Sequence, residues 1–72
     1  MWTDKQKALW AIIEQKYRVL GGHVDRHIGI RRGEIPNDNP DKACRAERLN
    51  MLLATQSLAF DLSCLIKSEI ES

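Results

Sequence analysis

The chain has 72 residues, of which 43% are hydrophobic, and its 11 basic and 10 acidic side chains leave a net charge of +1. This length fits one domain over residues 1–72, and the apolar content is too high for a disordered tail. The apolar residues are too scattered to indicate a membrane span, and the charge is too low for a strongly basic nucleic-acid-binding protein. The first residues form no apolar leader, which predicts a cytoplasmic protein without membrane contact.

A chain of this size buries only about 60% of the surface that its unfolded form exposes, so its core is marginal without further support. Cys44 and Cys64 match neither a zinc motif nor a disulfide framework, and we expect both to be reduced thiols. We expect Cys64 to be buried and inert in an apolar helix, and Cys44 to be structural rather than reactive. Self-association is the means of stabilisation that remains.

The first predicted helix covers residues from about 3 to 31. Thr3 and Gln6 have the spacing of a capping box, in which each side chain accepts a hydrogen bond from the other residue's backbone N–H. Gly21 and Gly22 lie inside this segment and together cost about 2 kcal/mol relative to alanine. We expect the helix to continue past them, with a kink or a break there as the alternative. Apolar residues keep a helical period on both sides: Leu9, Ile13, Tyr17, Leu20, Val24 and Ile28.

A loop is predicted from about residue 33 to 39, where proline, glycine and Asx residues gather. Asn39 followed by Pro40 predicts the start of a second helix, from about 40 to 70. This helix is apolar on more than one side, whereas a lone hairpin covers only one side of each helix. The sequence therefore predicts an all-α fold, a two-helix αα-hairpin that associates into a helical bundle. The expected oligomer interface comprises Leu9, Ile13, Leu20, Leu52, Leu58, Leu62, Leu65 and Ile66.

Arginine residues gather toward the loop end of this hairpin. A planar guanidinium group binds carboxylates and phosphates through two parallel hydrogen bonds. We therefore expect this end to bind an acidic partner or another anion, with a solvated charged rim, paired locally as in Asp41 with Arg45, as the alternative. The candidate contact residues are Arg26, Arg31, Arg32, Arg45 and Arg48.

The chain contains few groups arranged for chemistry. His23 and His27 are four residues apart and would share one side of a helix, as two metal ligands do, but no third ligand has a suitable spacing. A polar or interface role is expected for them. Nucleophile elbows, glycine-rich phosphate loops and paired carboxylates on an apolar face are all missing from the sequence. We expect no enzymatic activity, no catalytic residue, no metal and no cofactor.

Residues 24–35 resemble the turn and second helix of a helix-turn-helix motif, with Gly29 in the turn and Arg31 and Arg32 toward the DNA. Pro36 would cut such a recognition helix short. The resemblance implies a nucleic-acid-binding regulator, as does the likeness of the predicted architecture to the plasmid RNA-binding hairpin Rop.

A second resemblance concerns the helical hairpin of phage proteins that sequester cyclic-nucleotide immune signals. It is carried by Arg45, Leu49, Leu52, Phe60 and Leu65. The Leu-Glu-Glu-Ala run of those proteins is absent, since this chain has Ala-Thr-Gln-Ser at 54–57. The resemblance implies an oligomeric hairpin with a small anionic nucleotide as its ligand.

The sequence as a whole predicts a small, non-enzymatic, self-associating interaction protein, a homodimer or a higher oligomer. By analogy with short regulators of phages and plasmids, we expect an inhibitor or regulator that binds a host protein through its basic loop end. A nucleic-acid-binding regulator and a hairpin that sequesters a nucleotide signal are the two alternatives.

Overall fold

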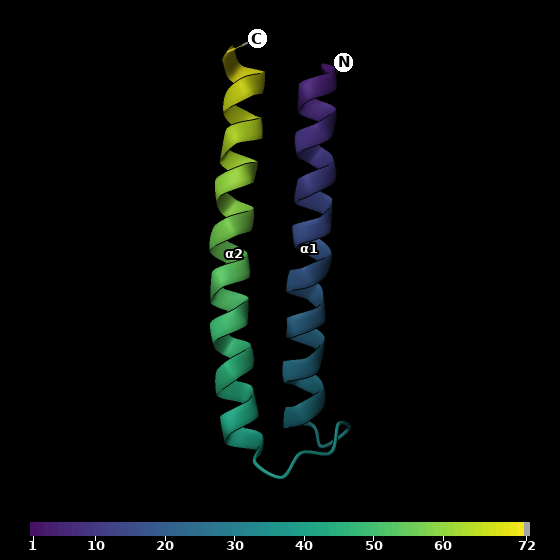
Figure 1. Ribbon diagram of the computed structural model, residues 1–72, viewed down its shortest axis with the longest axis vertical. Helices are drawn as coiled ribbons and strands as arrows, with labels where there is room; N and C mark the ends of the chain where they lie inside the picture. Colours follow the sequence, from purple (N-terminus) through teal and green to yellow (C-terminus); the bar gives the residue numbers. More distant parts are fainter. Residues whose placement is uncertain (72) are drawn as a thin grey trace.

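The computed structural model describes residues 1–71 and contains two long antiparallel helices joined by a short loop (Figure 1). Helix α1 spans Asp4–Arg31 and helix α2 spans Pro40–Glu71. The hairpin measures 51 × 16 × 13 Å, with both termini at one end and the loop at the other. This arrangement confirms the predicted all-α hairpin, and each helix bound lies within one residue of its expected position.

Short-range hydrogen bonds set the start of both helices. The Thr3 hydroxyl accepts from the Gln6 backbone N–H at 3.1 Å, and the Gln6 side-chain oxygen accepts from the Thr3 N–H at 2.9 Å, which confirms the capping box. Asn39 directly precedes Pro40, the first residue of α2. Its side-chain oxygen accepts a hydrogen bond from the Lys42 backbone N–H at 3.1 Å. Both N-termini therefore satisfy donors that have no partner inside their own helix.

Helix α1 ends in a Schellman motif built around Gly33, whose φ of 75° suits a residue without a side chain. The Gly33 N–H donates to the carbonyl of Ile30 at 3.1 Å, and the Glu34 N–H donates to the carbonyl of Gly29 at 2.9 Å. The side chain of Ile35 then folds back onto Gly29. A Cβ atom added to Gly29 would lie only 2.6 Å from the Cδ1 of Ile35. This turn directs the chain toward α2.

Helix α1 is continuous through Gly21 and Gly22, as we expected, and also through Gly29. Residues 32–35 form a turn and not a second helix. The helix-turn-helix geometry considered for residues 24–35 is therefore not formed. The reason is that α1 stays helical through Gly29, where the motif needs its turn, and that Ile35 packs back onto the end of the same helix.

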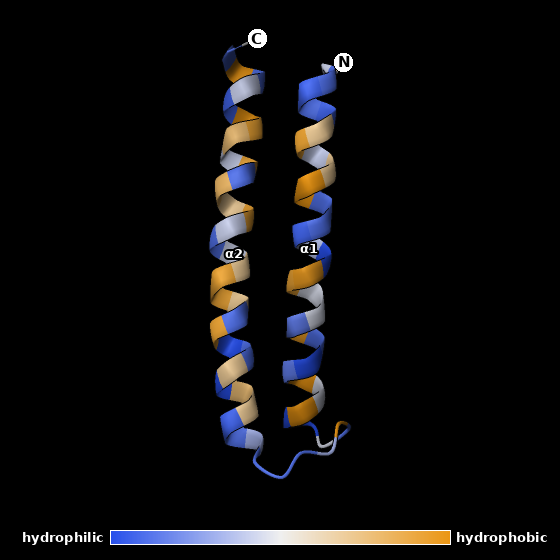
Figure 2. Ribbon diagram, viewed as in Figure 1, coloured by the Kyte–Doolittle hydropathy of each residue, from blue (hydrophilic) through white to orange (hydrophobic). Residues whose placement is uncertain are grey.

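The two helices meet along a seam in which residues seven apart repeat, as in an antiparallel coiled coil. All of these seam residues are buried or half-buried, yet only four hydrophobic residues among residues 1–71 are buried: Ile13, Ile30, Cys44 and Leu65. The core is thus one thin line, and Figure 2 shows apolar positions along the whole length of both helices. The seam consists of Gln6, Leu9, Ile13, Lys16, Leu20, His23, His27 and Ile30 of α1 with Cys44, Glu47, Met51, Ala54, Leu58, Asp61, Leu65 and Ser68 of α2.

The glycines of α1 provide a matched test of this packing. Gly22→Ala should raise the free energy of unfolding by up to about 1 kcal/mol, because the nearest atom to a new Cβ lies at an ordinary 3.7 Å. Gly29→Ala should lower stability, since the new methyl group displaces Ile35. Urea unfolding at one protein concentration, followed by circular dichroism, measures both. Equal stability of the two variants would show that Ile35 does not close the turn.

Candidate functional site

Polar side chains link the two helices at intervals along the seam. Gln6 donates to the Ser68 hydroxyl at 3.0 Å, and Lys16 forms an ion pair with Asp61. Nearer the loop, His23 contacts Glu47. Because a half-buried polar group is costly when its partner is displaced, a shift of one helix along the other would break several pairs together. These links therefore set the register of the hairpin.

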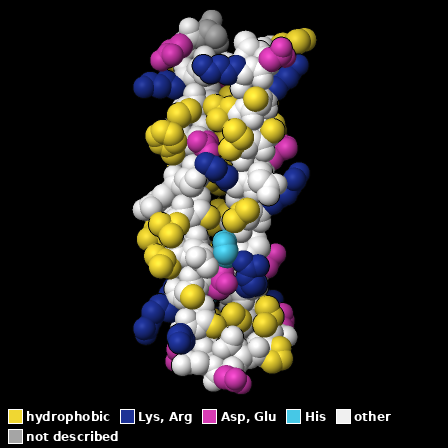
Figure 3. All heavy atoms as spheres, in the orientation of Figure 1, with side chains coloured by type: hydrophobic (Ala, Val, Ile, Leu, Met, Phe, Trp, Pro, Cys, Tyr) yellow, Lys and Arg dark blue, Asp and Glu magenta, His cyan; other side chains and the backbone are white. Residues whose placement is uncertain are grey.

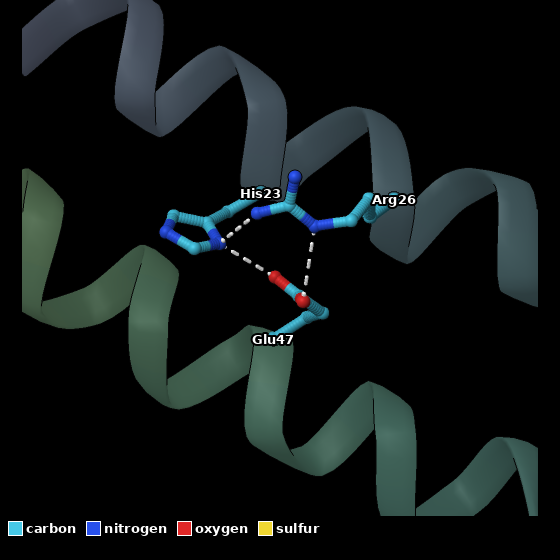
Figure 4. Close-up of polar contacts among 3 residues, drawn as sticks. All are labelled: His23, Arg26 and Glu47. Atoms are coloured by element: carbon cyan, nitrogen blue, oxygen red, sulfur yellow. Dashed lines mark hydrogen bonds and ion pairs between the residues drawn. The ribbon is translucent and has the colours of Figure 1, made fainter.

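The most connected of these links is formed by His23, Arg26 and Glu47 (Figure 4). The Nδ1 atom of His23 lies 2.7 Å from Glu47 Oε2, and the Nε of Arg26 donates to Glu47 Oε1 at 3.2 Å. The Nη2 of Arg26 lies 2.7 Å from the same His23 Nδ1. The side chains of His23 and Glu47 are 19% and 15% exposed, so solvent reaches this cluster only partly.

The protonation of His23 determines which of its two contacts is a hydrogen bond. One ring nitrogen carries either a proton or a lone pair: a protonated Nδ1 donates to Glu47, whereas an unprotonated Nδ1 accepts from Arg26. The hydrogen bond from His23 lowers the pKa of Glu47 below its ordinary value, and Arg26 adds to this effect against the opposing effect of burial. Glu47 therefore stays ionised in the folded hairpin and holds α2 to α1.

His23 and His27 do not form a metal site in the described chain. His23 is engaged by Glu47, and the Nδ1 of His27 is buried with no hydrogen-bond partner among residues 1–71. No group of three or more His, Cys, Asp or Glu side chains within these residues is placed to hold a metal ion.

The five candidate arginines share the loop half of the hairpin but differ in their surroundings. Arg26 is bound to Glu47, and Arg31 forms an ion pair with Asp41 at 3.0 Å. Asp41 is thus used across the loop and not by Arg45, the local pair considered from the sequence. Arg32 lies 4.0 Å from Glu34. Arg45 and Arg48 are exposed and, within residues 1–71, form no ion pair.

The eight residues predicted at an oligomer interface fall into two groups. Ile13 and Leu65 are each 3% exposed, because they pack between the two helices of one chain. Leu9, Leu20 and Leu58 are half-buried in the same seam. The exposed members, which a second chain can reach, are Leu52, Leu62 and Ile66. The periodicity located the apolar residues but did not separate contacts inside the chain from contacts outside it.

The two cysteines are also arranged differently from our expectation. Cys44 has no exposed surface and packs in the seam, as a structural residue does. Cys64 is exposed, so the prediction that it is buried is wrong. The residue follows the seam position Asp61 by three and precedes Leu65 by one, which places its side chain beside the seam and not within it.

One exposed apolar surface lies on the side of the hairpin where Trp2 is found. The Trp2 ring packs against Trp10 with 5.6 Å between ring centroids, and its indole N–H donates to Glu69 of α2. Trp10 and Glu69 therefore share this side, as do the residues at seven-residue steps from them and the residues four positions after these on the same side of each helix. We call this surface the Trp10 face: Trp10, Tyr17, Val24 and Ile28 of α1 with Leu52, Leu62 and Ile66 of α2.

A second apolar surface lies on the opposite side. Lys5 of α1 lines a hollow together with Cys64 and Lys67 of α2, so these positions and those seven residues away share this side. We call it the Phe60 face: Ile12, Val19, Leu53 and Phe60. In the view of Figure 3, charged side chains alternate with apolar patches along the groove between the helices.

Helix α2 is also long and apolar enough to cross a membrane, judged by length and composition, and little of that stretch is buried in the chain. The expectation that the apolar residues are too scattered for such a segment is wrong for this helix. The same length and composition occur in helices that pack inside soluble bundles. Asp61, paired with Lys16, lies within this helix.

Sequence reasoning missed the polar half of the seam. Glu47, Ala54, Asp61 and Ser68 are seven residues apart, a period that could have placed them on one line. It was overlooked because only apolar residues were used to find the contact face.

Comparisons with known proteins show no relative. No protein-family model matches the chain, and neither a curated protein nor a solved structure matches it significantly.

The Glu47 cluster generates a pH prediction. Because its folded-state pKa is depressed, Glu47 contributes stability above an unfolded-state value of about 4.5, and that contribution is lost as the pH falls through the folded-state pKa. Glu47→Gln should therefore lower the melting temperature at neutral pH and weaken its fall under acid. Thermal unfolding across this pH range is the measurement, with the exposed loop variant Asp38→Asn as control. An unchanged acid profile in Glu47→Gln would contradict this role.

Proposed function

We propose that the protein is a non-enzymatic interaction protein that self-associates into a helical bundle and binds its partner through the arginine-rich loop end. The observation that supports self-association is the large apolar surface outside the seam. Tyr17 and Phe60 are 68% and 70% exposed, and twelve further large hydrophobic residues are also exposed. Within the described part of the chain, the buried core contains only four hydrophobic residues.

Such an excess of exposed over buried hydrophobic side chains is unfavourable for a monomer in water. Burying apolar surface contributes roughly 25 cal/mol per Å², and soluble monomers rarely leave contiguous apolar patches beyond a few hundred Å². The Trp10 face extends from Ile66, near the termini, to Ile28, near the loop, so it follows most of the hairpin's length. A second chain laid along it would supply the core that one hairpin lacks.

The loop end supplies the chemistry for an external contact. Arg45 and Arg48 keep their guanidinium groups available, and Arg32 is held only loosely by Glu34. An acidic surface of a host protein would satisfy these groups by bidentate hydrogen bonds, as expected for an inhibitor or regulator of the phage or plasmid type that acts in the cytoplasm. Phosphate groups have the same chemistry, so nucleic acid is the second candidate.

Self-association is tested by the mass of the purified protein. Multi-angle light scattering over a range of concentrations should give a dimer or a larger assembly, with a melting temperature that rises with concentration. A single-chain mass of 8.3 kDa that persists at high concentration would remove the basis of the proposal.

The loop-end contact is tested with heparin as a polyanion probe. Arg45→Ala/Arg48→Ala should elute from a heparin column at lower salt than the wild type, because each phosphate-like contact contributes to the salt dependence. Lys5→Ala/Lys7→Ala, which removes two charges near the termini, is the matched control. If both variants elute at equally lowered salt, heparin binding depends on net charge alone and not on the position of the arginines. Saturable binding of duplex RNA or DNA at physiological salt would favour the nucleic-acid candidate over an acidic protein.

A further inference from the structure

The Trp10 face has an unbroken packing stripe, unlike the Phe60 face. Along α1 the stripe consists of Trp10, Tyr17, Val24 and Ile28, and the seam residues Ile13 and Leu20 lie between them at its inner edge. On the other flank of the seam, the corresponding line includes Lys16, His23 and Arg26, which are held by carboxylates of α2. These links therefore lie toward the Phe60 face. The Trp10 face is crossed by the hydrogen bond from Trp2 to Glu69 near the termini, and the rest of it keeps the pattern of a helix that packs against another helix.

The surface of this stripe is shaped to receive side chains. Two hollows flank Tyr17: one is bordered by Trp10 and Ile13, and the other by Leu20, Gly21 and Val24. A Cβ at Gly21 would have no atom within 4 Å, so another helix can approach the backbone closely here. The same face carries protruding side chains, such as Tyr17. A surface with both knobs and holes can pair with a copy of itself about a two-fold axis.

The dimensions agree with a second copy as the occupant. The broad outline of the hairpin, 51 × 16 Å, corresponds to roughly 800 Å², which is the area that each partner contributes to a standard protein interface. We propose that a second copy of this chain packs on the Trp10 face with its loop at the opposite end of the bundle. This inference rests on the self-association proposed above and specifies its face and its orientation.

Charge determines the orientation. Arg45 and Arg48 are at the loop end of this side of α2, and Glu69, three seven-residue steps beyond Arg48, is at the terminal end. With both loops at one end, four guanidinium groups would gather at the same level and repel one another. With the loops at opposite ends, α2 lies antiparallel to α2 of the second copy. The arginine pairs of the two copies then lie toward opposite ends of the bundle and do not repel one another.

This orientation has a functional consequence. It places one arginine-rich loop end at each end of the bundle, separated by about the 51 Å length of the hairpin. Arg32 and the loop itself stay outside the interface in both copies. The assembled protein therefore presents two equivalent partner sites that face away from each other, and it bridges two partners or two sites on one partner.

Leu52 and Leu53 form a matched pair that tests the face. They are adjacent leucines, each 54% exposed, yet Leu52 is on the Trp10 face and Leu53 on the Phe60 face. Leu52→Asp should weaken dimerisation by at least about tenfold, because a carboxylate would be buried without a partner, while Leu53→Asp should not. Sedimentation equilibrium measures the dissociation constants, and circular dichroism confirms that both variants remain helical. If Leu53→Asp weakens dimerisation and Leu52→Asp does not, the assignment of the interface to the Trp10 face is wrong, while self-association itself still holds.

The orientation is tested by a distance between the two loops. A nitroxide label on Asp38→Cys, with the exposed Cys64 changed to Ser and the buried Cys44 left in place, reports loop-to-loop separation by pulsed electron resonance. Opposite orientation should give a distance near the 51 Å hairpin length, whereas loops at one end would lie about 20 Å apart and would overturn it.

A wild-type chain that stays monomeric in buffer would overturn both the inference and the proposed function. The occupant itself is checked with phosphatidylcholine vesicles. Flotation of the wild type with the vesicles that is lost in Leu52→Asp and kept in Leu53→Asp, without a change of mass in buffer, would identify lipid and not a second copy as the cover of this face.

Discussion

The structure depends on matched polar pairs inside a narrow seam. Two helices that touch along one line bury few side chains, and an apolar line alone would allow one helix to slide along the other by a turn. Lys16 with Asp61 and His23 with Glu47 prevent this, because each carboxylate meets its partner in one register only. A single polar residue at a coiled-coil position can specify register in the same way, at some cost in stability. The positions of both outer faces follow from this register.

The same pairs explain why the apolar surface is outside the hairpin. Half of the seam line of α2 is occupied by Glu47, Asp61, Ser68 and the small Ala54, so many large apolar side chains of this helix point elsewhere. A chain that used its best hydrophobic residues for its own core would not leave leucines half-exposed on both sides. This distribution agrees with the assembly proposed above, in which intrachain contacts would set the register and contacts between chains would supply hydrophobic stabilisation.

The arginines show how structure refines a charge pattern. Counted along the sequence, five of them mark the loop half as basic. In the hairpin, Glu47 and Asp41 neutralise Arg26 and Arg31, and the available positive charge is left mainly on the first turns of α2. The number of basic residues therefore overstates the positive charge that is available to a partner. This available charge depends on where each arginine lies relative to the carboxylates of the opposite helix.

The sequence by itself determined the parts of this protein that depend on near neighbours. The capping box of Thr3 and Gln6, the start of α2 at Asn39 and Pro40, and the continuity of α1 through its glycine pair all follow from contacts within a few residues. Only the tertiary structure decided which apolar residues the chain buries itself. Ile13 and Leu65 are in the seam, Leu62 and Cys64 are outside it, and Ile35 closes a turn where a recognition helix was considered. The reason is geometric: a helix with apolar residues around most of its circumference has no preferred face until its polar residues find partners on another helix.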